Sequence, residues 1–105
     1  MTNFVFTYHG GSGMPESKEE QDQIMAAWGV WMGGLGAKLI DGGNPFAAHK
    51  TVAPDGAVSD GGPASTLSGY SVVSADSFEE AVDMAKGCPV LTSGGQVQVS
   101  ETIVM

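Results

Sequence analysis

The chain has 105 residues, 12 of them acidic and 4 basic, and all four basic residues are lysines, so its formal net charge is −8. Such acidity without arginine excludes nucleic-acid binding, which begins with the neutralisation of phosphates, and it disfavours anionic membrane surfaces. The length predicts one domain over residues 1–105, and 42% apolar residues are typical of a folded globule.

Two further features bear on where the protein resides. Apolar runs are too short to cross a bilayer, and the N-terminus shows no signal segment, so we expect no membrane partner. Cys88 is the only cysteine and cannot form an internal disulfide, which predicts a reducing compartment and hence a cytoplasmic location.

The first half of the chain predicts a strand, a helix and a short strand. Asn3–Tyr8 predicts a strand, because the aromatic residues at every second position share one face: Phe4, Phe6 and Tyr8. After a glycine-rich loop, Ser17-Lys18-Glu19-Glu20 matches a capping box that begins a helix. One apolar seam follows from the spacing of Ile24, Trp28, Trp31 and Leu35. The helix is expected to run to about Gly34, where Gly33, Gly34 and Gly36 would end it. Ala37–Asp41 predicts the short strand.

The second half predicts a hairpin, a strand, a helix and a strand. Pro54-Asp55-Gly56 is a strong turn signal between two short arms. Leu67–Ser74 alternates as a strand, and Ser77-Phe78-Glu79-Glu80 is a second capping box. The helix it begins ends at Gly87, and Gln96–Ser100 alternates as a last strand with its valines inward.

This order predicts an α+β domain with the ferredoxin-like split βαβ arrangement: an antiparallel sheet, both helices on one face and an inserted hairpin. The other face would then be uncovered. The strands carry six large apolar side chains, so we expect this face to be apolar and to be covered by a second subunit in a homodimer. The six are Phe4, Phe6, Tyr8, Tyr70, Val97 and Val99.

Several short motifs resemble those of the YCII-related family, in the branch named for a DGPF motif. They are the aromatic first strand, Trp28-Gly29-Val30-Trp31, Ser68-Gly69-Tyr70, Ser77-Phe78-Glu79-Glu80-Ala81 and Cys88-Pro89, in the family's order. The resemblance implies a dimeric α/β barrel, with two sheets face to face, in a mostly uncharacterised family. Two departures stand out: Trp28 occupies the place of a helix histidine suspected of catalysis in some members, and the DGPF motif reads Asp60-Gly61-Gly62-Pro63.

Catalytic candidates are His9, His49, Asp41 and Asp60. A histidine beside a carboxylate would serve acid–base chemistry near neutral pH. For both histidines the more common interpretation is an ordinary surface side chain. Both aspartates precede two glycines, which is typical of turns, but Asp60 is also the acid of the altered DGPF motif.

Ligand-pocket candidates lie between the sheet, the first helix and the Asp60 loop: Trp28, Trp31, Met32, Tyr8, Tyr70 and Asp60. The alternative for the tryptophans is plain core packing. We expect no cofactor and no metal, because the histidines, the cysteine and the acids show no ligand spacing. Cys88 follows a helix C-terminus, whose negative end raises a thiol pKa, so it is not expected to be a nucleophile.

Three functions remain open at this point. The first is a homodimeric domain that binds a small molecule in a cavity between the sheet and the first helix. The second is an enzyme that transfers protons on a small organic substrate, in the manner of a lyase or isomerase, and the third is a structural or assembly module. The lack of arginine argues against a pocket that clamps phosphate or dicarboxylates, so a neutral or weakly polar ligand is expected.

Overall fold

The computed structural model describes residues 2–10, 17–61 and 67–104. Its main sheet has four antiparallel strands in the order β2-β5-β1-β6. They are β2 (Leu39–Asp41), β5 (Leu67–Ala75), β1 (Thr2–His9) and β6 (Gln96–Glu101). The strand order and the two intervening helices confirm the predicted ferredoxin-like α+β arrangement.

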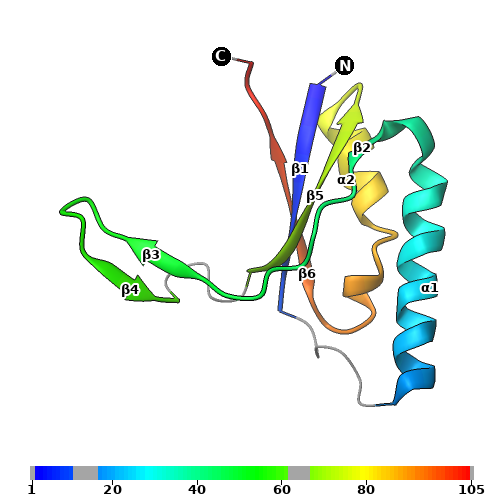
Figure 1. Ribbon diagram of the computed structural model, residues 1–105. Coiled ribbons are helices and arrows are strands. Elements are labelled where there is room, and N and C mark those ends of the chain that lie inside the picture. Colours follow the sequence, from blue (N-terminus) through cyan, green and yellow to red (C-terminus); the bar gives the residue numbers. More distant parts are fainter. Residues whose placement is uncertain (1, 11–16, 62–66, 105) are drawn as a thin grey trace.

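Both helices lie on the same side of the sheet (Figure 1). They are α1 (Lys18–Leu35) and α2 (Phe78–Ala85), and short 3₁₀ turns follow as η1 (Gly36–Lys38) and η2 (Pro89–Leu91). The serine half of both capping boxes is confirmed, because the hydroxyls of Ser17 and Ser77 accept from the backbone N–H of Glu20 and Glu80. None of the described helices is long and apolar enough to span a membrane.

The core lies between the helices and the sheet. Phe4, Phe6 and Tyr8 point from β1 into this layer, and Val73 and Ala75 join them from β5. From the helix side Ala81 and Ala85 are buried, and Trp28, Trp31 and Leu35 pack against the cluster. The period of two along β1 and the seam along α1 therefore meet as the sequence predicts.

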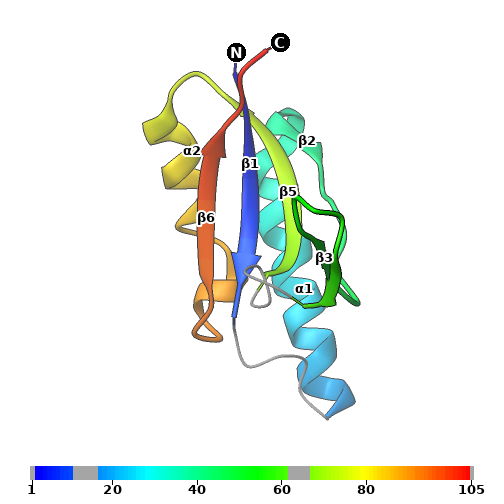
Figure 2. The same ribbon diagram turned by 90° about the vertical axis from the view of Figure 1, so that its left-hand side faces the viewer.

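The uncovered face of the sheet differs from the expectation (Figure 2). Of the six side chains expected there, only Tyr70 shares the open face, because the register sets Val97 and Val99 opposite Tyr8 and Phe6 on the helix side. The open face instead mixes apolar and polar residues: Val5, Thr7, His9, Tyr70, Val72, Gln98 and Ser100. An uncovered, wholly apolar face is therefore wrong as an argument for dimerisation.

The inserted hairpin is confirmed and projects away from the sheet on its open side (Figure 1). It consists of β3 (Lys50–Val52) and β4 (Val58–Asp60), with Lys50 opposite Asp60 and Val52 opposite Val58. The two valines are 67% and 61% exposed. Such exposed apolar side chains on an arm are a feature of segments that contact another molecule.

Candidate functional site

A short chain of buried hydrogen bonds lies between the sheet and the C-terminal half of α1. The Tyr8 hydroxyl donates to Ser71 Oγ at 2.7 Å, and Ser71 Oγ donates to the carbonyl of Gly42 at 2.7 Å. The rings of Tyr8 and Trp28 meet edge to face with centroids 5.0 Å apart. Because Tyr8 and Ser71 are buried, these bonds satisfy polar groups that would otherwise cost free energy.

Around this chain the structure brings together four of the six predicted pocket residues. Trp28 and Trp31 lie edge to face at 5.7 Å, and Trp31 Nε1 donates to the carbonyl of Met84 at 2.9 Å. A β-carbon on Gly42 would lie 3.6 Å from Met32 Sδ, so Met32 contacts the same turn. These side chains pack against one another, whereas Tyr70 lies on the opposite face and Asp60 on the hairpin.

Burial raises the pKa values of two groups next to this core. Desolvation raises the pKa of Tyr8 to about 12, although its bond to Ser71 works in the opposite direction. Desolvation also raises the pKa of the Cys88 thiol to about 11. The expected direction for Cys88 is confirmed, but burial is the cause, since the side chain is 2% exposed. A thiol of this kind is a poor nucleophile at neutral pH.

These shifts predict a loss of stability in alkali. Both groups hold their protons more tightly when folded than when unfolded, so their contribution is complete below about pH 9 and is lost as the pH rises to about 12. Urea unfolding at stepped pH should show a slope of at most about 1.4 kcal/mol per pH unit for each group. Tyr8→Phe should flatten the upper part of this decline and Cys88→Ala the lower part. Unchanged slopes in both variants would contradict the assignment.

The second group of side chains lies on the open face, and we call it the open-face cluster: Thr7, His9, Phe46, His49, Tyr70 and Gln98. Thr7 is in register with Tyr70 on one side and Gln98 on the other. His9 Nε2 lies 3.1 Å from Thr7 Oγ1 on the same strand. The cluster therefore presents hydroxyl, imidazole and amide groups on one surface.

Aromatic rings form one end of this cluster. Phe46 stacks on Tyr70 with centroids 5.7 Å apart and planes at 21°, and the His49 ring meets Phe46 at 5.5 Å. The turn before Phe46 lies close to the backbone of β5 and so positions the Phe46 ring. Gly43 in this turn has φ 72°, and Phe46 N donates to the carbonyl of Ser68 at 2.8 Å. The chain thus runs on along β5 after β2 ends, which sets Phe46 over Tyr70.

Three of the four predicted catalytic residues, Asp41, Asp60 and His49, bond to groups other than a predicted catalytic partner. Asp41 accepts from Gly43 N at 2.8 Å, which is the turn geometry the sequence allowed. Asp60 pairs with Lys50 at 3.2 Å on the exposed hairpin. His49 Nε2 lies 2.8 Å from the carbonyl of Leu67. Gly62 and Pro63 of the altered DGPF motif, and the predicted loop of Gly11, Ser12 and Gly13, lie outside the described residues.

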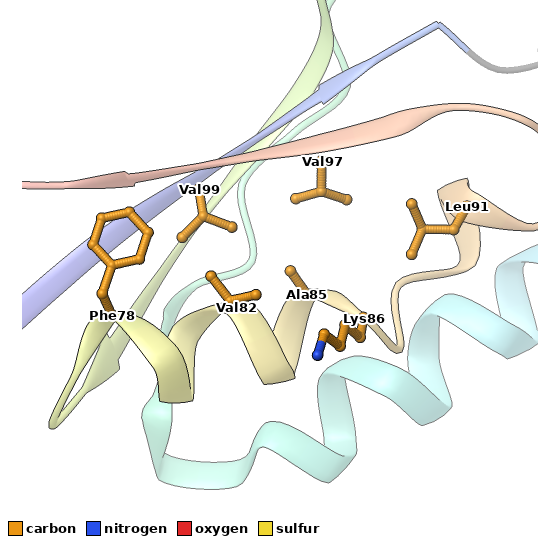
Figure 3. A pocket seen from close by; sticks show the side chains of 7 residues that line it. All are labelled: Phe78, Val82, Ala85, Lys86, Leu91, Val97 and Val99. Carbon is orange, nitrogen blue, oxygen red and sulfur yellow. The ribbon is translucent and has the colours of Figure 1, made fainter.

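A groove of about 420 Å³ lies between α2 and β6 on the helix side of the sheet. Val97 and Val99 point from β6 toward Val82 and Ala85, with Phe78 at one end and Leu91 at the other (Figure 3). Lys86 is at its rim. This groove was not predicted, because helix and strand patterns indicate which residues face inward and not how far two elements stand apart.

The described part of the chain contains no group of three or more His, Cys, Asp or Glu side chains that could hold a metal ion. The charged side chains instead form surface pairs. Lys38 bonds to Glu80, which raises the pKa of the lysine and lowers that of the glutamate, and Lys86 lies 3.3 Å from Asp83. Such exposed pairs contribute little stability.

Comparison with known proteins shows the fold. No protein-family model matches the chain, and neither does any curated protein. Among solved structures it is similar to 5-chloro-2-hydroxyhydroquinone dehydrochlorinase (TftG) from Burkholderia phenoliruptrix AC1100, in complex with 2,5-dihydroxybenzoquinone. The match covers 98% of this chain and 95% of that one, with a TM-score of 0.58 and 19% identity. At this identity the likeness establishes the α+β fold alone.

Sequence reasoning missed Phe46 and Ser71. Phe46 follows Gly42-Gly43-Asn44-Pro45, which reads as the end of a strand, so nothing in the pattern indicates that the chain continues along β5. Ser71 lies within the alternating residues of β5, and the alternation alone does not indicate that its hydroxyl bonds to Tyr8. A small polar residue on the buried face of such a strand is a usable signal, because a buried hydroxyl requires a partner.

Proposed function

We propose that the protein is a YCII-like domain over residues 1–105 that works as a homodimer and binds a small, neutral or weakly polar organic molecule. In this proposal the open sheet faces of two subunits oppose each other, and the open-face cluster lines the ligand site. This moves the site from the first helix, where Tyr8, Trp28 and Trp31 pack together, to the other face of the sheet.

One observation carries the proposal: polar and aromatic side chains are grouped on a sheet face that no helix of the described chain covers. Thr7, Tyr70 and Gln98 are neighbours across three strands, with Val5 and Val72 in the next rows. Ligand sites combine apolar walls with a few polar groups that fix orientation. The stacked rings of Phe46 and Tyr70 add a flat wall.

The chemistry of this surface favours a planar ring with hydroxyl or carbonyl groups. Aromatic side chains can stack on such a ring, and the hydroxyl, imidazole and amide groups can donate to or accept from its oxygens. The chain has no arginine to hold an anion in two-point fashion. The structurally similar dehydrochlorinase holds a dihydroxybenzoquinone, a molecule of this general shape, which supports the ligand class.

The exposed valines of the hairpin favour a homodimer, whereas the net negative charge of each subunit opposes it. The hairpin extends on the open side of the sheet, where its exposed valines Val52 and Val58 would reach a facing subunit. Each subunit has a formal charge of −8, so two subunits repel each other. Salt screens this repulsion, and added salt should therefore strengthen the dimer. The lone buried cysteine also supports the reducing cytoplasm as its location.

Two matched substitutions test the ligand site, with hydroquinone as the probe. Phe46→Leu removes the ring that stacks on Tyr70, whereas Phe78→Leu makes the same change on the helix side; the two side chains are 39% and 45% exposed. Calorimetric titration should show about a tenfold weaker Kd for Phe46→Leu, as expected for a lost stacking contact. Phe78→Leu should bind like the wild type.

Equal weakening in both variants, or no binding of hydroquinone and of related neutral rings by the wild type, would overturn the proposed site. Thermal unfolding of both variants in the absence of hydroquinone serves as the control, because both residues are partly exposed and a similar small effect on stability is expected.

A further inference from the structure

The two edges of the main sheet differ in how they are protected. At one edge β2 has three residues and an irregular register between Leu39 and Asp41, and Pro45 continues it as an isolated bridge to Gly69. Bulges, short length and proline all discourage pairing with another chain. This edge therefore has the features that prevent association.

At the other edge β6 has none of these features. Its six residues, Gln96–Glu101, pair regularly with β1, and within the described chain no strand lies on their outer side. The strand contains neither proline nor lysine, and its one charge is at the end, on Glu101. An unprotected edge of this kind presents backbone N–H and C=O groups that are ready to pair with another strand.

The groove between α2 and β6 runs directly beside this edge (Figure 3). Its apolar walls end in Phe78 and Leu91, which are 45% and 42% exposed. A strand added to β6 would place side chains of its helix-side face over this groove. The edge and the groove together form one surface that offers hydrogen bonds in one layer and apolar contact in the next.

We propose that β6 pairs antiparallel with β6 of a second copy of this chain about a two-fold axis, so that one sheet continues through both molecules. A register centred on Gln98 sets Val97 of one molecule opposite Val99 of the other, on the groove side. The alternation of Gln96 to Ser100 thus matches itself across the axis, as a self-complementary interface requires. Phe78 and Leu91 of each molecule then cover the groove of the other.

The charges of α2 favour a second copy in this orientation. Acidic residues begin the helix at Glu79 and Glu80, whereas Lys86 follows its last turn. The two-fold axis makes the two α2 helices antiparallel, so Lys86 of each approaches the acidic first turn of the other. A parallel arrangement would instead place the acidic turns together, which costs free energy through like-charge repulsion.

The size of the contact predicts modest affinity. Six strand residues span about 20 Å. The paired β6 strands and the two α2 helices beside them would bury about 1,000 Å² of total surface, which is the lower end for specific interfaces. Association is therefore expected at micromolar concentration. This interface leaves the open sheet face free, so it is independent of the proposed ligand site, and the two interfaces together would join more than two copies.

Hydrogen exchange of the backbone amides, read at low and high protein concentration, tests this pairing directly. Alternate amides of β6 that point away from β1 should exchange about tenfold more slowly at high concentration. Amides of β2 should exchange at the same rate at both concentrations. Light scattering on the same samples gives the molar mass, and Leu91→Ser should halve it. Ile40→Ser, a matched change at a 54% exposed residue of the edge strand β2, should not.

Concentration-independent exchange along β6 would overturn the proposal, as would equal molar masses for the wild type and Leu91→Ser. A third variant, Val72→Lys, places a charge on the open sheet face. It should break the face-to-face dimer and leave the concentration-dependent protection of β6 intact. Val72→Lys thus tests the face-to-face dimer of the proposed function, whereas Leu91→Ser tests the β6 pairing.

Discussion

Gly43→Ala is expected to destabilise the domain by about 3 kcal/mol or more, which is a large fraction of the total for a chain of this size. Gly43 has φ 72°, and a β-carbon there would lie 1.7 Å from the carbonyl oxygen of Tyr70 and 2.7 Å from its carbonyl carbon. Both atoms belong to the backbone of β5, so neither can move aside without shifting the strand. Urea unfolding measures the loss.

A matched control separates the clash from the backbone conformation. Gly56 in the hairpin turn has φ 88°, also in the left-handed region, but a β-carbon there meets nothing within 4 Å. Gly56→Ala should therefore cost only the conformational strain, about 1 kcal/mol. If the two variants lost equal stability, the close approach of Gly43 to Tyr70 would not be what fixes this turn.

Because the turn also positions Phe46, Gly43→Ala should weaken hydroquinone binding as well.

Phe6→Ala is expected to cost about 3–5 kcal/mol, as does truncation of other fully buried aromatic residues. Phe6 is 0% exposed at the centre of β1, and its ring stacks on Trp31 with centroids 6.1 Å apart. Its removal leaves a cavity between the sheet and α1 that strand residues on either side cannot fill without shifting. Urea unfolding monitored by tryptophan fluorescence reports both the stability and the surroundings of Trp31.

Phe6→Leu provides the graded comparison, because leucine keeps most of the side-chain volume. This variant should lose less than about 1.5 kcal/mol of unfolding free energy relative to the wild type. Phe46→Ala, which truncates a partly exposed ring on the other face, should cost less than Phe6→Ala. Similar losses for Phe6→Ala and Phe46→Ala would contradict the placement of the core on the helix side.

Local signals in the sequence predict the order of elements well. The serines that begin both helices, the Pro54-Asp55-Gly56 turn and Gly36 at the end of α1 are confirmed, because each depends on bonds or dihedral angles within a few residues. Gly33 and Gly34 lie within α1 instead of ending it. Packing of the Trp28–Leu35 seam on the sheet outweighs their low helix propensity.

Features that depend on which strands meet are not predicted in the same way. Alternation shows that Tyr70 and Val73 face opposite sides of β5, but only the pairing with β1 shows that Tyr70 shares a face with Thr7 and not with Tyr8. A shift of one residue in register would exchange the two sides. For this reason the predicted pocket combined residues from both faces, Tyr8 and Tyr70 among them.

The candidate site is also shaped by long-range contacts. Phe46 reaches Tyr70 only because the chain after β2 continues along β5. Asp60 lies at the base of the hairpin, opposite Lys50, and the hairpin is on the side of the sheet away from the first helix. The sequence places Asp60 and Trp28 in one pocket through a family motif, and no local pattern limits how far the hairpin projects. Within the described residues, Asp60 of the altered motif ends β4 and pairs with Lys50, so it does not join Trp28 in one pocket.

Nuclear magnetic resonance titration of the isotope-labelled protein with hydroquinone tests the central claim, a ligand site on the open sheet face, most directly. The account predicts that the largest shifts fall on Thr7, Tyr70 and Gln98, with the signals of the Trp28 and Trp31 rings unchanged. Shifts confined to the packed residues around Tyr8 and Trp28, or to Val97 and Val99 in the groove beside α2, would contradict it.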